Sequence, residues 1–170
     1  MMLRNTILIA AIIAHFILVG ADIFGQVVIA PVVLSSPPES LAMFQGPYPY
    51  DSTIFWQPAN MIALGLLIAS VAANWRTSRR FLLLCWLAGS VLVTIWSLGF
   101  VFPEYISIIS TDYANSVDPD LVERGSDWRV LAFVRNLVFM GIGLLPLIAL
   151  TKSTRQGGPS EAEKGDEADA

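Results

Sequence analysis

The chain has 170 residues, of which 55% are hydrophobic and only 14% are charged. Because a soluble domain usually carries about a quarter charged residues, this composition excludes an ordinary soluble globule and favours a membrane protein with several spans. The net charge of -4 and the lack of basic clusters argue against a nucleic-acid partner. The chain has a single cysteine, Cys85, which excludes an internal disulfide and a thiolate zinc site.

Four stretches are long and apolar enough to cross a bilayer, which needs about 20 mostly apolar residues per helix. They cover roughly residues 6–34, 54–73, 81–102 and 128–150. The first is over-long and contains Pro31, so we expect it to tilt or to emerge into the polar region. Trp56 and Trp75 flank the second and are typical of interfacial anchors. The pattern predicts an all-α membrane protein, a four-transmembrane-helix bundle formed by residues 1–151.

Charged residues between the spans predict an orientation, because short loops rich in Lys and Arg stay on the cytoplasmic side. The first and third loops are acidic, with Arg124 as their one basic residue. Basic residues instead precede the first span, fill the second loop and follow the fourth span: Arg4, Arg76, Arg79, Arg80, Lys152 and Arg155. We therefore expect both termini in the cytoplasm and a multi-pass protein of a bacterial plasma membrane.

The two ends of the chain differ in character. Arg4, an apolar run and Val19-Gly20-Ala21 imitate a secretory signal peptide, but the apolar pattern continues well past Ala21, which favours an uncleaved first span. Residues 152–170 contain no apolar residue larger than Ala. Such a segment cannot bury enough surface to fold, so we expect a disordered acidic cytoplasmic tail.

The first and third loops carry distinct local signals. Turn and extended-chain residues at Ser35–Ser40 and Gly46–Tyr50 predict a non-helical first loop. Its aromatic side chains either fold over the mouth of the bundle as a lid or belong to an interfacial belt: Phe44, Tyr48, Tyr50 and Phe55. In the third loop, Asp118-Pro119 predicts the N-cap and first turn of a short surface helix that ends before Gly125.

Three ionisable residues lie deep inside the predicted spans: His15, Asp22 and Arg135. Charges in hydrocarbon are costly, so such residues face the bundle interior, pair with one another and mark functional sites. His15 and Asp22 are seven residues apart and Gln26 is four further on, which places all three on one stripe of the first helix. The long arginine side chain can cover the difference in depth, so we predict a buried Asp22–Arg135 ion pair with Gln26 and Asn136 as further partners.

These residues define a candidate site. His15, Asp22 and Arg135 are the candidate catalytic residues, with His15 as a general base or proton carrier. The candidate substrate-binding residues are Gln26, Trp56, Asn60, Thr94, Trp128 and Asn136. One histidine with one nearby carboxylate does not make a metal site, and no Glu-x-x-His motif repeats along the spans, so we expect no metal; a haem held by His15 alone is a weaker alternative.

A structural interpretation of each polar group stays open. His15 is equally consistent with a neutral imidazole that is hydrogen-bonded between helices, and the Asp22–Arg135 pair with a role in helix packing alone. Ser90, Thr94 and Ser97 form a polar stripe on the third span, and such stripes more often pack helices together than line a pocket.

Four elements in a fixed order carry a family resemblance. They are Asp22 followed by a Val-rich stretch that ends at Pro31, Phe55–Pro58 at the start of span two, Phe102-Pro103 at the end of span three, and Trp128 followed by Arg135-Asn136. Together they resemble the anthrone oxygenase-like family, small four-span membrane proteins long catalogued as a domain of unknown function. Where its polyketide-tailoring members have an Asn-Pro-like turn, this chain has Phe102-Pro103-Glu104.

The resemblance implies oxidation of a polycyclic phenolic anthrone to a quinone by molecular oxygen, without a metal or organic cofactor. His15 would remove the proton and Arg135 would stabilise the enolate oxygen of a hydrophobic aromatic molecule arriving from the lipid bilayer. Two alternatives remain open: a non-catalytic scaffold that recruits a partner protein, and a transporter or proton relay that uses His15 and Asp22. The latter would need an oligomer, because no inverted repeat is visible.

Overall fold

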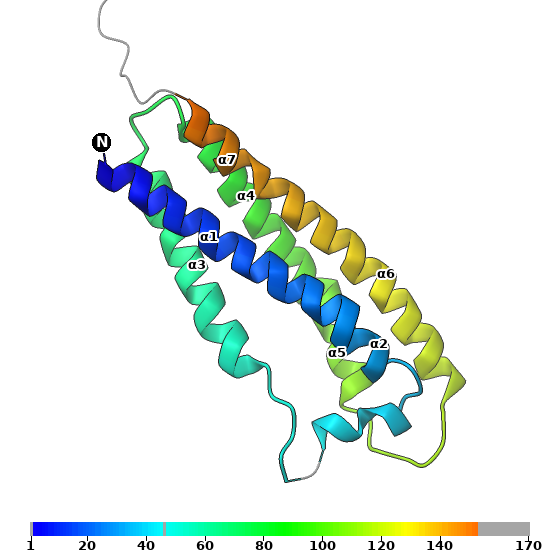
Figure 1. Ribbon diagram of the computed structural model, residues 1–170. Coiled ribbons are helices and arrows are strands. Elements are labelled where there is room, and N and C mark those ends of the chain that lie inside the picture. Colours follow the sequence, from blue (N-terminus) through cyan, green and yellow to red (C-terminus); the bar gives the residue numbers. More distant parts are fainter. Residues whose placement is uncertain (1, 46, 153–170) are drawn as a thin grey trace, which may run out of the picture.

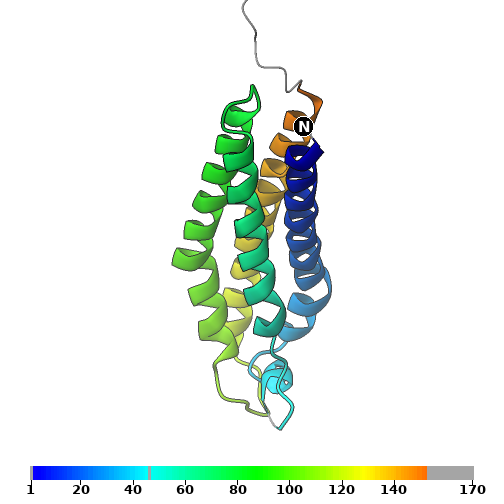
Figure 2. The same ribbon diagram turned by 90° about the vertical axis from the view of Figure 1, so that its left-hand side faces the viewer.

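The computed structural model describes residues 2–45 and 47–152, and within these ranges the chain is helical with no β-strand. The predicted tail beyond Lys152, including Arg155, therefore lies outside the described residues. Four helices are long and apolar enough to cross a membrane, and they run side by side (Figures 1 and 2): Met2–Val33, Thr53–Ala73, Arg80–Ile109 and Pro119–Thr151. The predicted class, an all-helical bundle with four candidate spans, is confirmed.

Three of the four long helices consist of more than one segment. The first is α1 (Met2–Phe24), the π-helical turn η1 (Gly25–Ile29) and α2 (Ala30–Val33); the second is α3 (Thr53–Ala73). The third is α4 (Arg80–Trp96), the π-helical turn η3 (Ser97–Val101) and α5 (Phe102–Ile109); the fourth is α6 (Pro119–Ile142) and α7 (Leu144–Thr151). A short 3-10 helix, η2 (Glu39–Phe44), lies in the first loop.

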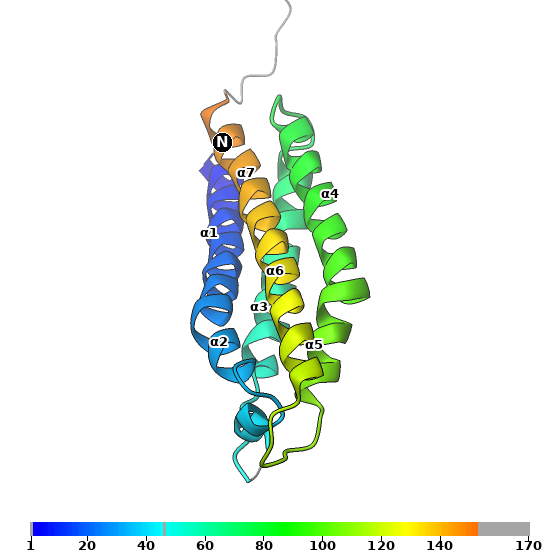
Figure 3. The same ribbon diagram turned by 90° about the vertical axis from the view of Figure 1, so that its right-hand side faces the viewer.

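Each long helix packs against its neighbours in the chain, and the first and fourth helices close the ring. Helix α1 packs against α3 on one side and against α6 and α7 on the other, while α4 packs against α3, α6 and α7. The start of α1, the α3–α4 connection and the end of α7 lie at one end of the bundle, and η2 and the α5–α6 connection lie at the other (Figures 1 and 3). Both described chain ends thus share one end, as four spans require.

The buried apolar side chains form two clusters, one toward each end of the bundle. The first contains Leu8, Ala11, Ile12, Leu67, Val71, Leu83, Trp86 and Ala149. The second contains Ala30, Val33, Leu34, Leu41, Val101, Ile108, Trp128 and Ala132. Large apolar side chains also cover the outside, including Leu92 and Val130, which are 66% and 65% exposed. An exterior this apolar is typical of a bundle surrounded by lipid.

The two π-helical turns each end just before a proline. The N–H of Ala30 donates to the carbonyl of Gly25, and Pro31 follows. The N–H of Phe102 donates to the carbonyl of Ser97, and Pro103 follows. A proline cannot donate a hydrogen bond, and its ring crowds the carbonyl of the preceding turn, so we attribute the wider turns to these prolines. The helix of span three continues past the predicted end at Phe102, because α5 extends it to Ile109.

The fourth span begins earlier than hydropathy indicates. The predicted N-cap is confirmed, since the Asp118 carboxylate accepts a hydrogen bond of 3.0 Å from the backbone N–H of Asp120. The predicted short surface helix is wrong, because α6 runs without a break to Ile142. Gly125 does not stop it: a Cβ there would lie 3.2 Å from Cβ of Leu34, so glycine instead permits close packing against the end of span one.

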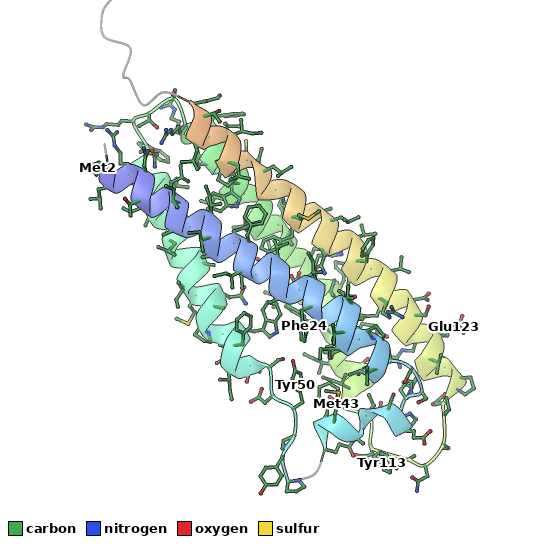
Figure 4. The ribbon with its side chains drawn as sticks, in the orientation of Figure 1. Met2, Phe24, Met43, Tyr50, Tyr113 and Glu123 are labelled. Carbon is green, nitrogen blue, oxygen red and sulfur yellow. The ribbon has the colours of Figure 1, made fainter. Side chains whose placement is uncertain are left out.

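The first loop packs onto the end of the bundle instead of being wholly non-helical. Leu41 of η2 is fully buried in the second cluster, and the side chain of Gln45 bonds to the backbone of Thr111 and Tyr113 at 3.1 and 3.2 Å. Figure 4 shows Met43, Tyr50 and Tyr113 at this end. The lid interpretation therefore suits η2, whereas Tyr48 is 93% exposed.

Candidate functional site

Asp22 of α1 and Arg135 of α6 form the predicted buried ion pair. Arg135 Nη2 lies 2.8 Å from Asp22 Oδ1, and the two side chains are 9% and 17% exposed. The predicted contact is confirmed. A buried ion pair compensates for its desolvation only when its remaining donors and acceptors are also hydrogen-bonded. The other hydrogen bonds of Arg135 therefore determine whether the pair stabilises the bundle.

Arg135 also binds two neutral polar side chains. Its Nη2 donates to Asn136 Oδ1 at 2.5 Å, and its Nη1 donates to Ser97 Oγ at 3.4 Å. The Ser97 hydroxyl in turn donates to the carbonyl of Val93. The Nε donor of Arg135 is buried and has no partner among the described residues. The guanidinium thus joins the first, third and fourth long helices but keeps one unsatisfied donor.

Both π-helical turns border this ion pair. The turn η1 begins three residues after Asp22 and contains Gln26, and η3 begins at Ser97, which binds Arg135. At the far end of η3, Trp128 Nε1 donates to the carbonyl of Val101 at 2.7 Å. Because π-helical turns are frequent at functional sites, their position on both sides of Arg135 marks this region.

An apolar groove opens on the outside of the bundle between the first and fourth helices. Its volume is about 180 Å³, and it is lined by Ile23, Gln26, Val27, Phe133, Asn136, Leu137 and Met140. Most of the lining is hydrocarbon, and the two polar members are the amide side chains of Gln26 and Asn136. Asn136 connects the groove directly to the ion pair through its bond to Arg135. Two predicted binding residues therefore meet here.

His15 lies elsewhere and uses both of its ring nitrogens. Its Nε2 is 3.1 Å from the carbonyl of Phe139, and Trp86 Nε1 donates to its Nδ1 at 3.4 Å. One neutral tautomer satisfies both bonds, with Nδ1 accepting and Nε2–H donating. The residue is 4% exposed, and Gly143 makes room for its ring. This geometry favours the structural interpretation of His15.

A second, smaller cavity of about 70 Å³ lies beside His15. Asn60, Ser90 and Thr94 supply most of its polar lining, and Ser90 Oγ is buried without a partner among the described residues. The volume is enough for a few water molecules. The candidate residues therefore divide into two groups, with Asn60 and Thr94 beside His15 and with Gln26 and Asn136 beside the ion pair.

The two candidate tryptophans line neither of these spaces. The carbonyl of Trp56 accepts a hydrogen bond of 2.7 Å from Asn60 Nδ2, and its ring contacts Phe55 edge-on. Trp128 is buried and stacks on Tyr105 with ring centroids 4.6 Å apart. Their substrate-binding role stays a prediction, and the contacts seen are structural.

Arg79 is a buried cation, although in the sequence it stands out only as an orientation signal. It is 3% exposed, and it donates to the carbonyls of Leu150 and Lys152 at the end of α7 and to Asn5 Oδ1 of α1. Arginine at a helix C-terminus satisfies its free carbonyls. Burial, and secondarily the positive charge of Arg4, lower the pKa of Arg79. No charge pattern distinguishes it from Arg76 or Arg80 beforehand.

The described residues contain no group of three or more His, Cys, Asp or Glu side chains placed to hold a metal ion. The polar groups that line the groove are therefore two amides, with the Asp22–Arg135 ion pair next to them through Asn136. Comparisons of the chain with protein-family models, with curated proteins and with solved structures find no match.

Proposed function

We propose that this chain is a multi-pass membrane protein that binds a hydrophobic aromatic small molecule in the groove between α1 and α6. Following the distribution of basic residues, both termini face the cytoplasm of a bacterial cell. The observation that carries the proposal is the groove itself, whose apolar walls surround two amide groups next to a buried ion pair. Binding sites for small molecules usually combine an apolar lining with a few placed polar groups.

The position of the groove suits a ligand that arrives through the membrane. Its walls include Val27 and Phe133, which are 68% and 56% exposed on the outside of the bundle. A ligand dissolved in lipid therefore reaches the groove sideways, without crossing water. Its apolar part contacts these walls while its polar end meets Gln26 and Asn136.

The resemblance to the anthrone oxygenase-like family supports an enzymatic form of this proposal. An anthrone loses a proton from its methylene carbon to a base, and the resulting carbanion forms a C–O bond with molecular oxygen. The peroxide takes the proton back and loses water, which leaves the quinone carbonyl. His15 is committed to Trp86 and Phe139 and borders the other cavity, so this form assigns the base to Asp22, which must exchange its contact with Arg135 for the substrate proton. Arg135 beside it stabilises the enolate oxygen that develops.

A purely structural role is the second candidate, and the burial of Asp22 and Arg135 favours it. Each charge has its partner within 2.8 Å, and Arg135 connects three of the long helices. A scaffold of this kind predicts that variants of the pair lose stability while no compound binds saturably at the groove.

The test measures binding of benzophenone, a neutral aromatic ketone, to the full chain in lipid nanodiscs. We expect saturable binding above the partition into empty nanodiscs. Leu137→Trp fills the groove and should abolish it, whereas Leu92→Trp, an equal change at a position that is 66% exposed and outside both cavities, should not. Unsaturable partition that neither variant changes would refute the proposal and leave the structural role.

A further inference from the structure

We infer that the groove selects ligands whose polar end is an uncharged hydrogen-bond acceptor, a carbonyl oxygen, and that Asn136 is the residue responsible for this selection. The inference rests on the proposed function and specifies the ligand chemistry of the same groove. Two observations support it: the hydrogen bonds that Arg135, Asn136 and Gln26 make or leave unmade, and the balance of charge around them.

The orientation of the Asn136 amide is fixed by Arg135. A guanidinium has only donors, so the Asn136 atom 2.5 Å from Arg135 Nη2 must be the carbonyl oxygen Oδ1. The amide cannot flip without placing two donors together. Its Nδ2 group is then left over, and it has no acceptor among the described residues. Because Asn136 lines the groove, this N–H₂ group is available to a bound molecule.

The second polar side chain of the lining, Gln26, also has N–H₂ donors, together with a carbonyl acceptor of its own. The side-chain amide of Gln26 lines the same groove and makes no hydrogen bond to any described residue. Nearby, the buried Nε of Arg135 lacks an acceptor. A buried or lipid-facing donor without a partner costs about 1–3 kcal/mol, so a ligand that supplies an acceptor oxygen gains where a hydrocarbon does not.

The charge balance excludes a charged acceptor. Asp22 already neutralises Arg135 at 2.8 Å, so a ligand carboxylate would add a second negative charge opposite a single positive one. In a medium of low dielectric constant, an unpaired charge is far costlier than a missing hydrogen bond. A neutral carbonyl oxygen meets the free amide donors without disturbing the pair.

The test compares benzophenone with diphenylmethane, which differ only in that a carbonyl replaces a methylene group. In nanodiscs with the full chain, we expect benzophenone to bind about three- to tenfold more tightly, the effect of one neutral hydrogen bond. The infrared carbonyl band of bound benzophenone should shift to lower frequency than in empty nanodiscs. Diphenylacetate should bind more weakly than either compound.

Two variants assign the preference to its residues. Asn136→Leu should bring the affinity ratio of the two compounds close to one and abolish the infrared shift. Gln26→Leu breaks no hydrogen bond among the described residues, so it should fold normally and reduce the ratio. Because the ratio is taken within one variant, a general loss of folded protein cancels.

The outcomes separate this inference from the proposed function. Equal saturable binding of both compounds to the natural chain, an unshifted carbonyl band, or a ratio that neither variant changes would overturn the carbonyl selection and leave the groove as a binding site. Tighter binding of diphenylacetate would also overturn it. No saturable binding of any compound would refute the proposed function and this inference together.

Discussion

Asp22 Oδ1 and Arg135 Nη2 lie 2.8 Å apart, although the two residues stand near opposite ends of the helical part of the chain. Their contact joins the first and last long helices and so closes the ring of four. The same guanidinium holds Asn136 in place at the edge of an outward-facing groove. One residue therefore connects the packing of the bundle with the chemistry of its candidate site.

Breaking this ion pair should be costly. Asp22→Asn leaves Arg135 buried with its charge unpaired, and we expect a loss of about 3–5 kcal/mol in the free energy of unfolding in mixed micelles. The double variant with Asp22→Asn and Arg135→Gln should lose less free energy of unfolding than the two single variants lose in sum. As a control, Glu104→Gln breaks the Arg124–Glu104 pair, whose side chains are more than a third exposed, and should cost about 1 kcal/mol or less. Equal losses at both pairs would contradict this account.

Gly143→Ala should displace the ring of His15. An added Cβ would lie 2.6 Å from His15 Nε2, so we expect overpacking to cost about 1–3 kcal/mol. Gly141→Ala, two residues away, meets nothing within 4 Å and should be neutral or slightly stabilising, because alanine favours a helix. Thermal unfolding of the two variants side by side measures the difference. A Gly143→Ala variant as stable as Gly141→Ala would show that His15 is not packed as described.

Arg79→Met should destabilise the end of the bundle that holds both described chain ends. The change removes hydrogen bonds to Asn5, Leu150 and Lys152, for which a loss on the order of 2–4 kcal/mol is expected because bonds from charged groups are the stronger ones. The neighbouring Arg80→Met, at an exposed position, should change stability by less than about 0.5 kcal/mol. Chemical denaturation of both proteins tests this, and similar losses would contradict the special role of Arg79.

The carboxylate of Asp51 should stabilise the start of α3 in a pH-dependent way. Hydrogen bonds from the hydroxyl group and then from the backbone N–H of Thr53 lower the pKa of Asp51. A lowered pKa in the folded state means that the stabilisation is present above the unfolded value, about 3.9, and is lost as the pH falls through the folded value. Thr53→Val removes the larger contribution, so an NMR titration of the Asp51 carboxyl should give a higher pKa than in the natural chain. An unchanged titration would refute the contact.

The sequence predicted the helices best where hydropathy and helix coincide. For α3, the expected range 54–73 differs from the observed Thr53–Ala73 by one residue. In the third and fourth spans, the helices continue past the apolar stretches. Pro103 is a typical helix end in sequence, but the π-helical turn η3 accommodates it within one long helix. Pro119 and the polar residues after it fall outside the apolar stretch of span four, although α6 begins there.

The candidate site was predictable in part. The depth of Asp22 and Arg135 within their spans is enough to predict their contact, because a charge inside the membrane is stabilised by a partner of opposite charge. It did not show that His15, on the same stripe as Asp22, would turn to Trp86 and Phe139. That choice depends on which helix lies opposite each turn of α1, which hydropathy does not encode. The groove likewise depends on the π-helical turn η1, for which Gly25 and Pro31 were the available signals.

Photolabelling tests the central claim, ligand binding in the groove beside the ion pair, most directly. Benzophenone forms covalent bonds with nearby C–H groups when irradiated, and mass spectrometry of peptides from the full chain locates the adducts. We expect adducts concentrated at Ile23, Val27, Leu137 and Met140, which line the groove, and loss of the adducts at Ile23, Val27 and Met140 in the groove-filling Leu137→Trp variant. Adducts spread evenly over the exposed apolar surface, or gathered beside His15 at Leu64 and Ala63, would contradict it.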